Sequence, residues 1–149
     1  MRLLGLKILL VEDDVDNLEL LASFLEGEGA ITFGASSIAA ALLQTEGREL
    51  DAVVSDLDLA DGDGCALLAA LRARDGRTDR PAIAVTGYSE QKWRAKAASC
   101  GFERFAVKPY SLEGLVDWLV ELTARPQNAA LAEFCHASPG PVARARLAR

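Results

Sequence analysis

The sequence of 149 residues is poor in the side chains that bind soft metals. Its three cysteines, Cys65, Cys100 and Cys135, are odd in number and widely spaced, and His136 is its single histidine. Structural zinc sites use closely spaced thiol and imidazole ligands, and no Cys-x-x-Cys occurs here. We therefore expect no zinc site. We interpret the adjacent Cys135 and His136 as incidental, because neighbours in sequence rarely face each other productively.

Long apolar runs and an excess of positive charge are also missing. No uninterrupted apolar stretch reaches the length that crosses a bilayer. The apolar start, MRLLGLKILLVEDD, passes into acidic residues without a small-residue cleavage site. The formal net charge is −6, which argues against general binding to nucleic-acid phosphates. We predict a cytoplasmic protein that binds neither a membrane nor nucleic acid directly.

The regular feature of the chain is an alternation of short apolar runs with stretches of helical periodicity. Half of the residues are hydrophobic, which is enough for a sizeable core in one domain. Five strand–helix units with short connections predict a parallel sheet covered by helices on both faces. The predicted strands are 7–11, 30–34, 51–55, 81–85 and 104–107, and the predicted helices are 14–29, one capped by Ser36 or Ser37, 64–74, 89–100 and 111–123.

The end of the chain departs from this pattern. Residues 125–149 contain Pro126, Pro139 and Pro141, are net basic, and offer no further strand–helix unit. We predict a domain over residues 1–124, followed by a flexible tail of Pro, Ala and Arg character over residues 125–149.

Chemically active side chains follow four of the five predicted strands. Their positions are Glu12, Asp13 and Asp14 after the first strand, Asp56 and Asp58 after the third, Thr86 after the fourth, and Lys108 after the fifth. Parallel strands bring all their carboxyl ends to one edge of the sheet, where ligands of such folds bind. Clustered carboxylates repel one another unless a cation joins them, and hard oxygen ligands suit Mg²⁺ or Mn²⁺. A lysine and a hydroxyl beside that cation suit a phosphoryl group.

Each of these residues also has a simpler explanation when it is taken alone. Asp13, Asp14 and Asp16 fit the acidic first turn of a helix, and Asp61 and Asp63 fit turn positions, with Asp63 also able to begin the next helix. Four independent coincidences at four strand ends are harder to accept, so we favour a shared site.

These residues resemble the receiver domain of two-component response regulators, the phospho-acceptor partners of histidine kinases. The matching segments are ILLVEDD (8–14), VVSDLDLADGDG (53–64), AVTGY (84–88) and FAVKPY (105–110), in the family's order, within a similarity that covers about residues 6–123. The resemblance implies a flavodoxin-like α/β fold, with a doubly wound five-stranded parallel sheet in the order 2-1-3-4-5 and five helices.

The resemblance also implies a role for each matching residue. Asp56 is expected to accept the phosphoryl group. Asp13, Asp56 and the backbone carbonyl of Asp58 are expected to bind Mg²⁺ directly, and Glu12 to act through water. Lys108 is expected to pair with the phosphoryl group, and its bond to Pro109 to be cis. Thr86 and Phe105 are implied as the switch residues, whose movement would alter the face made by the fourth helix, the fifth strand and the fifth helix.

Several positions depart from the family pattern or vary within it. Ala60 stands where proline is frequent, and Phe105 stands where tyrosine is common. Asp58 and Tyr88 each lie two residues after a site residue, Asp56 and Thr86, and both flank the path of an attacking water. We expect these two residues to set the lifetime of the phosphorylated state.

Other functions fit the sequence less well. An EF-hand needs an oxygen ligand and a glycine where Ala60 and Asp61 stand, and no nucleotide-binding glycine motif is completed. The DLD segment at 56–58 also resembles the nucleophile motif of haloacid-dehalogenase-type phosphatases, but those carry it on the first strand. A receiver used only for docking, without phosphorylation, remains an alternative.

The implied partners are a histidine kinase or a histidine phosphotransfer protein, and an unknown downstream protein. The resemblance does not make the chain an enzyme, since a receiver promotes only its own phosphorylation and dephosphorylation. No effector domain follows the predicted receiver, so the chain is expected to dock a partner, relay phosphate, or serve as a receiver of a hybrid kinase. Trp93 and Trp118 fall on the two helices of the switch face, through which a homodimer could form, and we interpret both as partly buried packing residues.

Overall fold

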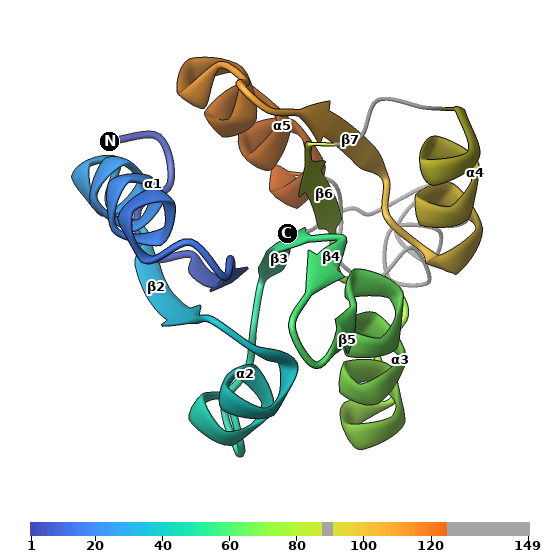
Figure 1. Ribbon diagram of the computed structural model, residues 1–149. Helices are drawn as coiled ribbons and strands as arrows, with labels where there is room; N and C mark the ends of the chain where they lie inside the picture. The colour runs from blue at the N-terminus through green and yellow to red at the C-terminus, as the bar shows by residue number, and fades with distance from the viewer. Residues whose placement is uncertain (88–90, 125–149) are drawn as a thin grey trace, which may run out of the picture.

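The fold is a doubly wound α/β sandwich, seen in the computed structural model, which describes residues 1–87 and 91–124. Five parallel strands form one sheet in the order β2-β1-β3-β6-β7 (Figure 1). The predicted order 2-1-3-4-5 is thereby confirmed, with β6 and β7 as its fourth and fifth strands. The strands are β1 (Lys7–Val11), β2 (Ile31–Ala35), β3 (Ala52–Asp56), β6 (Ala82–Thr86) and β7 (Arg104–Val107).

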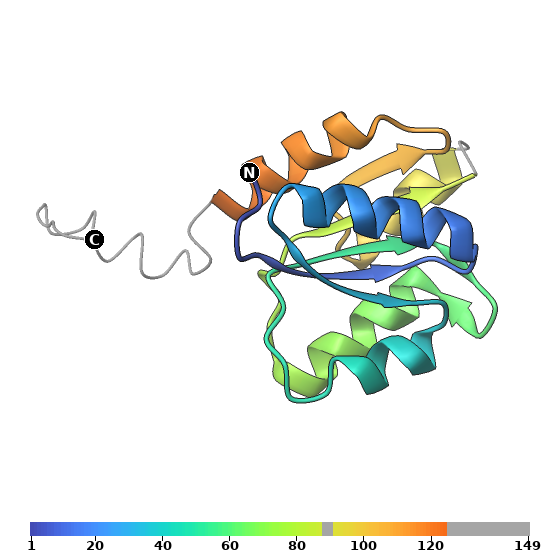
Figure 2. The same cartoon turned by 90° about the vertical axis from the view of Figure 1, so that its left-hand side faces the viewer.

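The helices cover both faces of this sheet (Figure 2). Alternate side chains of β1 point to opposite faces, so that Ile8 and Leu10 join one apolar cluster while Leu9 and Val11 join the other. The first cluster packs against α1 and α5, and the second against α2, α3 and α4. The helices are α1 (Val15–Gly27), α2 (Ile38–Gln44), α3 (Gly64–Asp75), α4 (Gln91–Cys100) and α5 (Leu112–Ala124).

Polar side chains begin three of these helices. The carboxylate of Asp14 accepts from the backbone N–H groups at the start of α1, and the hydroxyl of Ser37 and the carboxylate of Asp63 do the same for α2 and α3. These are the residue types that best satisfy the unpaired donors of a first helical turn. Of the two serines predicted to cap α2, Ser37 is therefore the cap. Asp63, whose position in the sequence also allowed it to begin the next helix, caps α3.

The structure differs from the sequence prediction after β3. A two-stranded antiparallel hairpin, β4 (Asp58–Leu59) with β5 (Gly62–Asp63), occupies the segment interpreted as a turn. Only two residues on each side pair, which is too short for an alternating pattern to reveal. Three strands also begin and end one residue later than predicted, because ladder partners decide their ends.

Some predictions fall on residues outside the described part of the chain. These are the structure of Tyr88, the flexibility of residues 125–149, and the placement of Cys135 and His136. Among the described helices, none is both long enough and apolar enough to cross a membrane.

Candidate functional site

Four strand ends place the predicted site residues at one edge of the sheet. β1 delivers Glu12 and Asp13, β3 ends on Asp56, β6 ends on Thr86, and β7 leads directly to Lys108. The parallel register aligns these ends, since Val11 pairs with Ser55, Asp56 with Val85, and Thr86 with Val107. The convergence expected from the sequence is thus present in the structure.

Lys108 joins the two buried carboxylates of this edge. Its Nζ lies 2.7 Å from Oε1 of Glu12 and 2.9 Å from Oδ2 of Asp56. The Glu12 and Asp56 side chains are only 5% and 8% exposed, whereas Lys108 is 26% exposed. A cation between two carboxylates removes the repulsion that the carboxylates would otherwise exert on each other.

The position of the lysine is set by its backbone. The N–H of Lys108 donates to the carbonyl of Thr86 at 2.7 Å, which ties the end of β7 to the end of β6. The Lys108–Pro109 peptide bond is cis. The side chain therefore starts from the sheet edge itself and reaches back toward β1 and β3.

The carboxylate of Asp56 is held at both oxygens. Oδ2 accepts from Lys108 at 2.9 Å, and Oδ1 accepts from the backbone N–H of Asp58 at 3.2 Å. The carbonyl oxygen of Asp56 accepts from the hydroxyl of Ser55 at 2.8 Å. These contacts orient a carboxylate that is buried but faces the edge where ligands bind.

Burial and pairing shift the pKa values of this cluster. Burial raises the pKa of Glu12, while the hydrogen bond from Lys108 and the N–H of Asp14 partly offset that rise. Burial alone would lower the pKa of Lys108, but its hydrogen bonds to Asp56 and Glu12 outweigh this effect and the pKa is raised. Lys108 is therefore a permanent positive charge at neutral pH.

The same residues meet the requirements of a hard metal ion. One carboxylate oxygen from each of Glu12, Asp13 and Asp56 lies within 4.8 Å of the others, and Asp13 is exposed to solvent. Oxygen ligands of this kind, with an open side, match Mg²⁺ or Mn²⁺. Asp58, which follows Asp56 by two residues, is also exposed to solvent.

The two predicted switch residues lie on the neighbouring strands β6 and β7. Thr86 is fully buried at the end of β6, and Phe105 is half-buried in β7. The guanidinium of Arg94 on α4 lies 4.7 Å from the centre of the Phe105 ring, a cation–π distance. Trp93 and Trp118 are partly buried and pack against the two apolar clusters, as predicted.

Three contacts around the site were not predicted. Asp61 of the hairpin accepts from the N–H groups of Ile38 and Ala39, so it holds the start of α2 as well as making a turn. Asp63 pairs with Lys96 of α4 at 2.7 Å. Cys65 and Cys100 form a disulfide. No local sequence pattern signals these contacts, because each joins segments more than 20 residues apart.

The comparisons with known proteins agree with this geometry. The sequence profile described as the response regulator receiver domain matches residues 8–120, which is most of the chain. The chain belongs to this family. The haloacid-dehalogenase alternative is set aside, because the family match accounts for the acidic residues after both β1 and β3.

Relatives of the receiver include both short and long proteins. An uncharacterised 14.6 kDa protein of Leptolyngbya boryana is 36% identical over 68% of this chain and 78% of its own length. The KDP operon transcriptional regulatory protein KdpE of Escherichia coli is 29% identical over 91% of this chain, which spans only 56% of that regulator. A CheY-like receiver domain protein from Methanospirillum hungatei has a crystal structure that matches with a TM-score of 0.74, at 25% identity over 80% of this chain and 94% of that one.

Proposed function

We propose that this receiver is a phospho-acceptor in a two-component phosphorelay and that Asp56 receives the phosphoryl group. The observation that carries the proposal is the buried Asp56 carboxylate, held by Lys108 beside Glu12 and Asp13. A carboxylate oxygen held in place by a lysine can act as the nucleophile toward a phosphoryl group. The chain is then not an enzyme in the usual sense, since it promotes only its own phosphorylation and dephosphorylation.

The transfer needs positioning and neutralised charge more than covalent assistance. A carboxylate oxygen of Asp56 attacks the phosphorus of a phosphohistidine; a P–O bond forms, the P–N bond breaks, and the imidazole nitrogen leaves with its electron pair. Lys108 stays beside the group and balances the charge of its oxygens. Mg²⁺, held by Asp13, Asp56 and the backbone carbonyl of Asp58, with Glu12 acting through water, would supply further positive charge, and Mn²⁺ has the same ligand preference.

The acyl phosphate adds nearly two negative charges at the end of β3. We propose that Thr86 moves toward this group and that Phe105 turns inward in response, which changes the α4–β7–α5 face. Phe105 must then leave its contact with Arg94. Asp58 and Tyr88 are proposed to set the lifetime of the acyl phosphate, since each follows a site residue, Asp56 or Thr86, by two positions in the sequence.

A phosphohistidine donor needs a docking surface next to Asp56. A cavity of about 400 Å³ opens beside the site, between α1 and the segment after β7; it is lined by Glu12, Asn17, Leu20, Leu21, Lys108, Pro109, Tyr110 and Leu112. Val15 and Leu20 of α1 are 57% and 60% exposed, which provides apolar contact area for a partner. We propose that a histidine kinase or a histidine phosphotransfer protein binds here.

We further propose that a downstream protein or a second copy of this chain binds the α4–β7–α5 face. The proposed location is cytoplasmic.

The test is incorporation of phosphate from acetyl phosphate, followed by intact mass spectrometry. With Mg²⁺ present, wild type should gain the mass of one phosphoryl group, and Asp56→Asn should gain none. Asp58→Asn is the matched control: it removes a neighbouring carboxylate but keeps the acceptor, so it should still be modified, with a changed rate of decay. Failure of wild type with both acetyl phosphate and a phosphohistidine donor would instead support the docking alternative, in which phosphorylation plays no part.

A further inference from the structure

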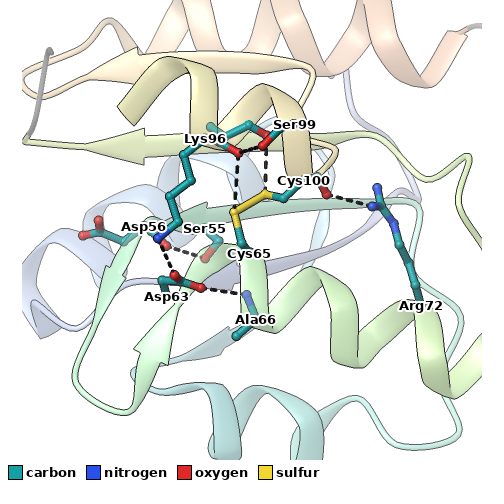
Figure 3. Close-up of a disulfide and its surroundings, with 10 residues drawn as sticks. Ser55, Asp56, Asp63, Cys65, Ala66, Arg72, Lys96, Ser99 and Cys100 are labelled. Atoms are coloured by element: carbon teal, nitrogen blue, oxygen red, sulfur yellow. Dashed lines mark hydrogen bonds and ion pairs between the residues drawn. A yellow bond between two sulfur atoms is a disulfide. The ribbon is translucent and has the colours of Figure 1, made fainter. Parts of the chain in front are cut away.

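A disulfide joins α3 to α4 at the edge of the proposed switch face. Cys65 is the second residue of α3 and Cys100 is the last residue of α4, and their Cα atoms are 5.6 Å apart (Figure 3). Nothing in the phosphoryl chemistry described above uses these residues. Their bond nevertheless connects the helix that begins after the acceptor loop with the helix that carries Arg94.

The start of α3 is packed closely against the acceptor strand. A Cβ added at Gly64 would lie 2.8 Å from the carbonyl oxygen of Asp56 and 3.2 Å from the Phe102 ring. Only glycine permits this approach, so Cys65 follows directly on the residue that touches the backbone of Asp56. A covalent bond from Cys65 to α4 therefore links α4 to the rigid end of β3.

The other contacts between these two helices are weaker than the disulfide. The Nζ of Lys96 lies 2.7 Å from Asp63, with side chains 47% and 34% exposed, and ion pairs of such exposure contribute little. Arg72 of α3 donates to the carbonyl of Cys100 at 2.9 Å. Opening the disulfide would leave α4 held to α3 mainly by these polar contacts and by apolar packing.

Both cysteines are partly exposed to solvent at the margin of the second apolar cluster, so the disulfide does not lie in the closed core. Accessible disulfides are the ones that exchange readily. In a reducing compartment, disulfides are usually transient and regulatory; this step of the argument rests on the cytoplasmic location proposed above. The reduced thiols also have acceptors, since Cys65 Sγ lies 3.7 Å from the carbonyl oxygen of Lys96 and Cys100 Sγ lies 3.4 Å from that of Ala97.

We propose that Cys65 and Cys100 form a reversible dithiol–disulfide couple that fixes α4 to the start of α3 when it is oxidised. The oxidant is a small-molecule disulfide such as oxidised glutathione. The Cys65 thiolate attacks one sulfur of that molecule, forms a mixed disulfide and releases one small thiolate. The Cys100 thiolate then attacks Cys65 Sγ and releases the second. The two protons lost by the protein thiols end on the two small thiols, so the protein is oxidised by two electrons and the small disulfide is reduced by two.

The consequence is a redox-dependent switch face. α4 forms one side of the α4–β7–α5 face, and its residue Arg94 covers Phe105. With the disulfide closed, α4 is restrained relative to β3. With the disulfide open, α4 gains freedom to move against α3.

The test combines thiol trapping with hydrogen exchange on the full chain carrying Cys135→Ser, so that only the pair can react. The protein is equilibrated in buffers from fully oxidised to fully reduced glutathione, alkylated, and mapped by mass spectrometry. We expect the Cys65–Cys100 bond to be closed in oxidised buffer and open in reduced buffer. We also expect the amides of α4 to exchange about tenfold faster in the reduced protein, because a local restraint has been removed.

The matched control adds Cys65→Ala and Cys100→Ala, and its α4 should exchange at the fast rate in both buffers. If this variant does not fold, the comparison of oxidised and reduced protein still decides the matter. Three results would overturn the proposal: a bond that never closes in oxidised glutathione, a bond that stays closed in excess reduced glutathione, or an opening that leaves α4 exchange unchanged. None of these readouts requires phosphorylation, so failure of the phospho-acceptor function would be recognised separately.

Discussion

Lys108 is the site residue that pairs with both buried carboxylates. It neutralises Glu12 and Asp56, which are both nearly excluded from solvent, and its raised pKa keeps it charged. Removing it would leave two buried carboxylates facing each other without a protein cation. Its position between β1 and β3 also places it beside any group bound to Asp56.

Substitution of Lys108 should therefore affect phosphorylation more than any exposed lysine does. We expect Lys108→Met to lower the rate of modification by acetyl phosphate by about 100-fold, the typical effect of losing one charge-stabilising donor. Lys7→Met, at an exposed residue of β1, should leave the rate unchanged. The rates are measured by intact mass at successive times. Equal rates for Lys108→Met and wild type would contradict the role given to this lysine.

Metal binding at the acidic cluster should be visible as thermal stability. If Mg²⁺ binds the folded chain as proposed, saturating Mg²⁺ should raise Tm, and a concentration tenfold above Kd contributes about 1.4 kcal/mol. Burial raises the pKa of Glu12, so protonation begins at a higher pH than for an ordinary glutamate. Protons therefore compete with Mg²⁺ for this carboxyl, and the stabilisation by Mg²⁺ should decline as the pH falls from neutral into acid.

The control for this metal effect is Asp13→Asn, which removes an exposed carboxylate of the cluster without opening the core. Its Tm should respond to Mg²⁺ much less than that of wild type, and a chelator should reverse the wild-type shift. An equal response of the two proteins, measured by scanning calorimetry, would place the metal elsewhere.

At the scale of elements, the hairpin after β3 connects Asp56 to three helices. Asp61 accepts from the first N–H groups of α2, and Asp63 begins α3 and also pairs with Lys96 of α4. The segment that looked like a solvated turn thus fixes the starts of neighbouring elements. A disturbance at Asp56 has short covalent and hydrogen-bonded paths to α2, α3 and α4.

Two substitutions of Asp63 distinguish its contribution as the cap of α3 from its ion pair with Lys96. Asp63→Ala loses both the cap of α3 and the ion pair, and should lower the free energy of unfolding by about 1 kcal/mol. Asp63→Asn keeps a capping oxygen and loses only the ion pair, so its effect should be smaller. Urea unfolding of the two variants measures the difference, and an equal loss in both would mean that the pairing with Lys96, rather than capping, dominates.

The contribution of Asp63 to the free energy of unfolding should also depend on pH. The hydrogen bond from Lys96 and the N–H of Ala66 lower the pKa of Asp63. A carboxyl whose pKa is lower in the folded chain contributes stability that is present above its unfolded value and is lost as the pH falls through the folded value. The difference between wild type and Asp63→Ala should therefore shrink in acid, below about pH 4.

At the scale of the whole molecule, the sheet and the grouping of the site residues could be predicted from the sequence, whereas several contacts between distant segments could not. Strand–helix alternation predicted a parallel sheet, and the resemblance to receiver domains implied its strand order. Parallel strands necessarily bring Glu12, Asp56, Thr86 and Lys108 to one edge. The pairing of Cys65 with Cys100 was not predictable, because it depends on how α3 packs against α4. The support of α2 by Asp61 was missed for the same reason, since local patterns do not record contacts between distant segments.

The sandwich as a whole presents two separate working surfaces. One is the edge with Asp56, beside the cavity between α1 and the segment after β7. The other is the α4–β7–α5 face, where Arg94 lies over the ring of Phe105. Cys100, one residue of the disulfide, is the last residue of α4. Phosphorylation of Asp56 at the first surface is proposed to change the second surface.

The measurement that tests this most directly is the position of the acyl phosphate. The protein is phosphorylated with acetyl phosphate and Mg²⁺, treated with borohydride to convert the acyl phosphate into an alcohol, and digested for peptide sequencing by mass spectrometry. We expect position 56 to be converted from aspartate to homoserine, and Asp13 and Asp58 to be unchanged. Conversion at Asp13 or Asp58, with Asp56 intact, would contradict the assignment of Asp56 as the phospho-acceptor.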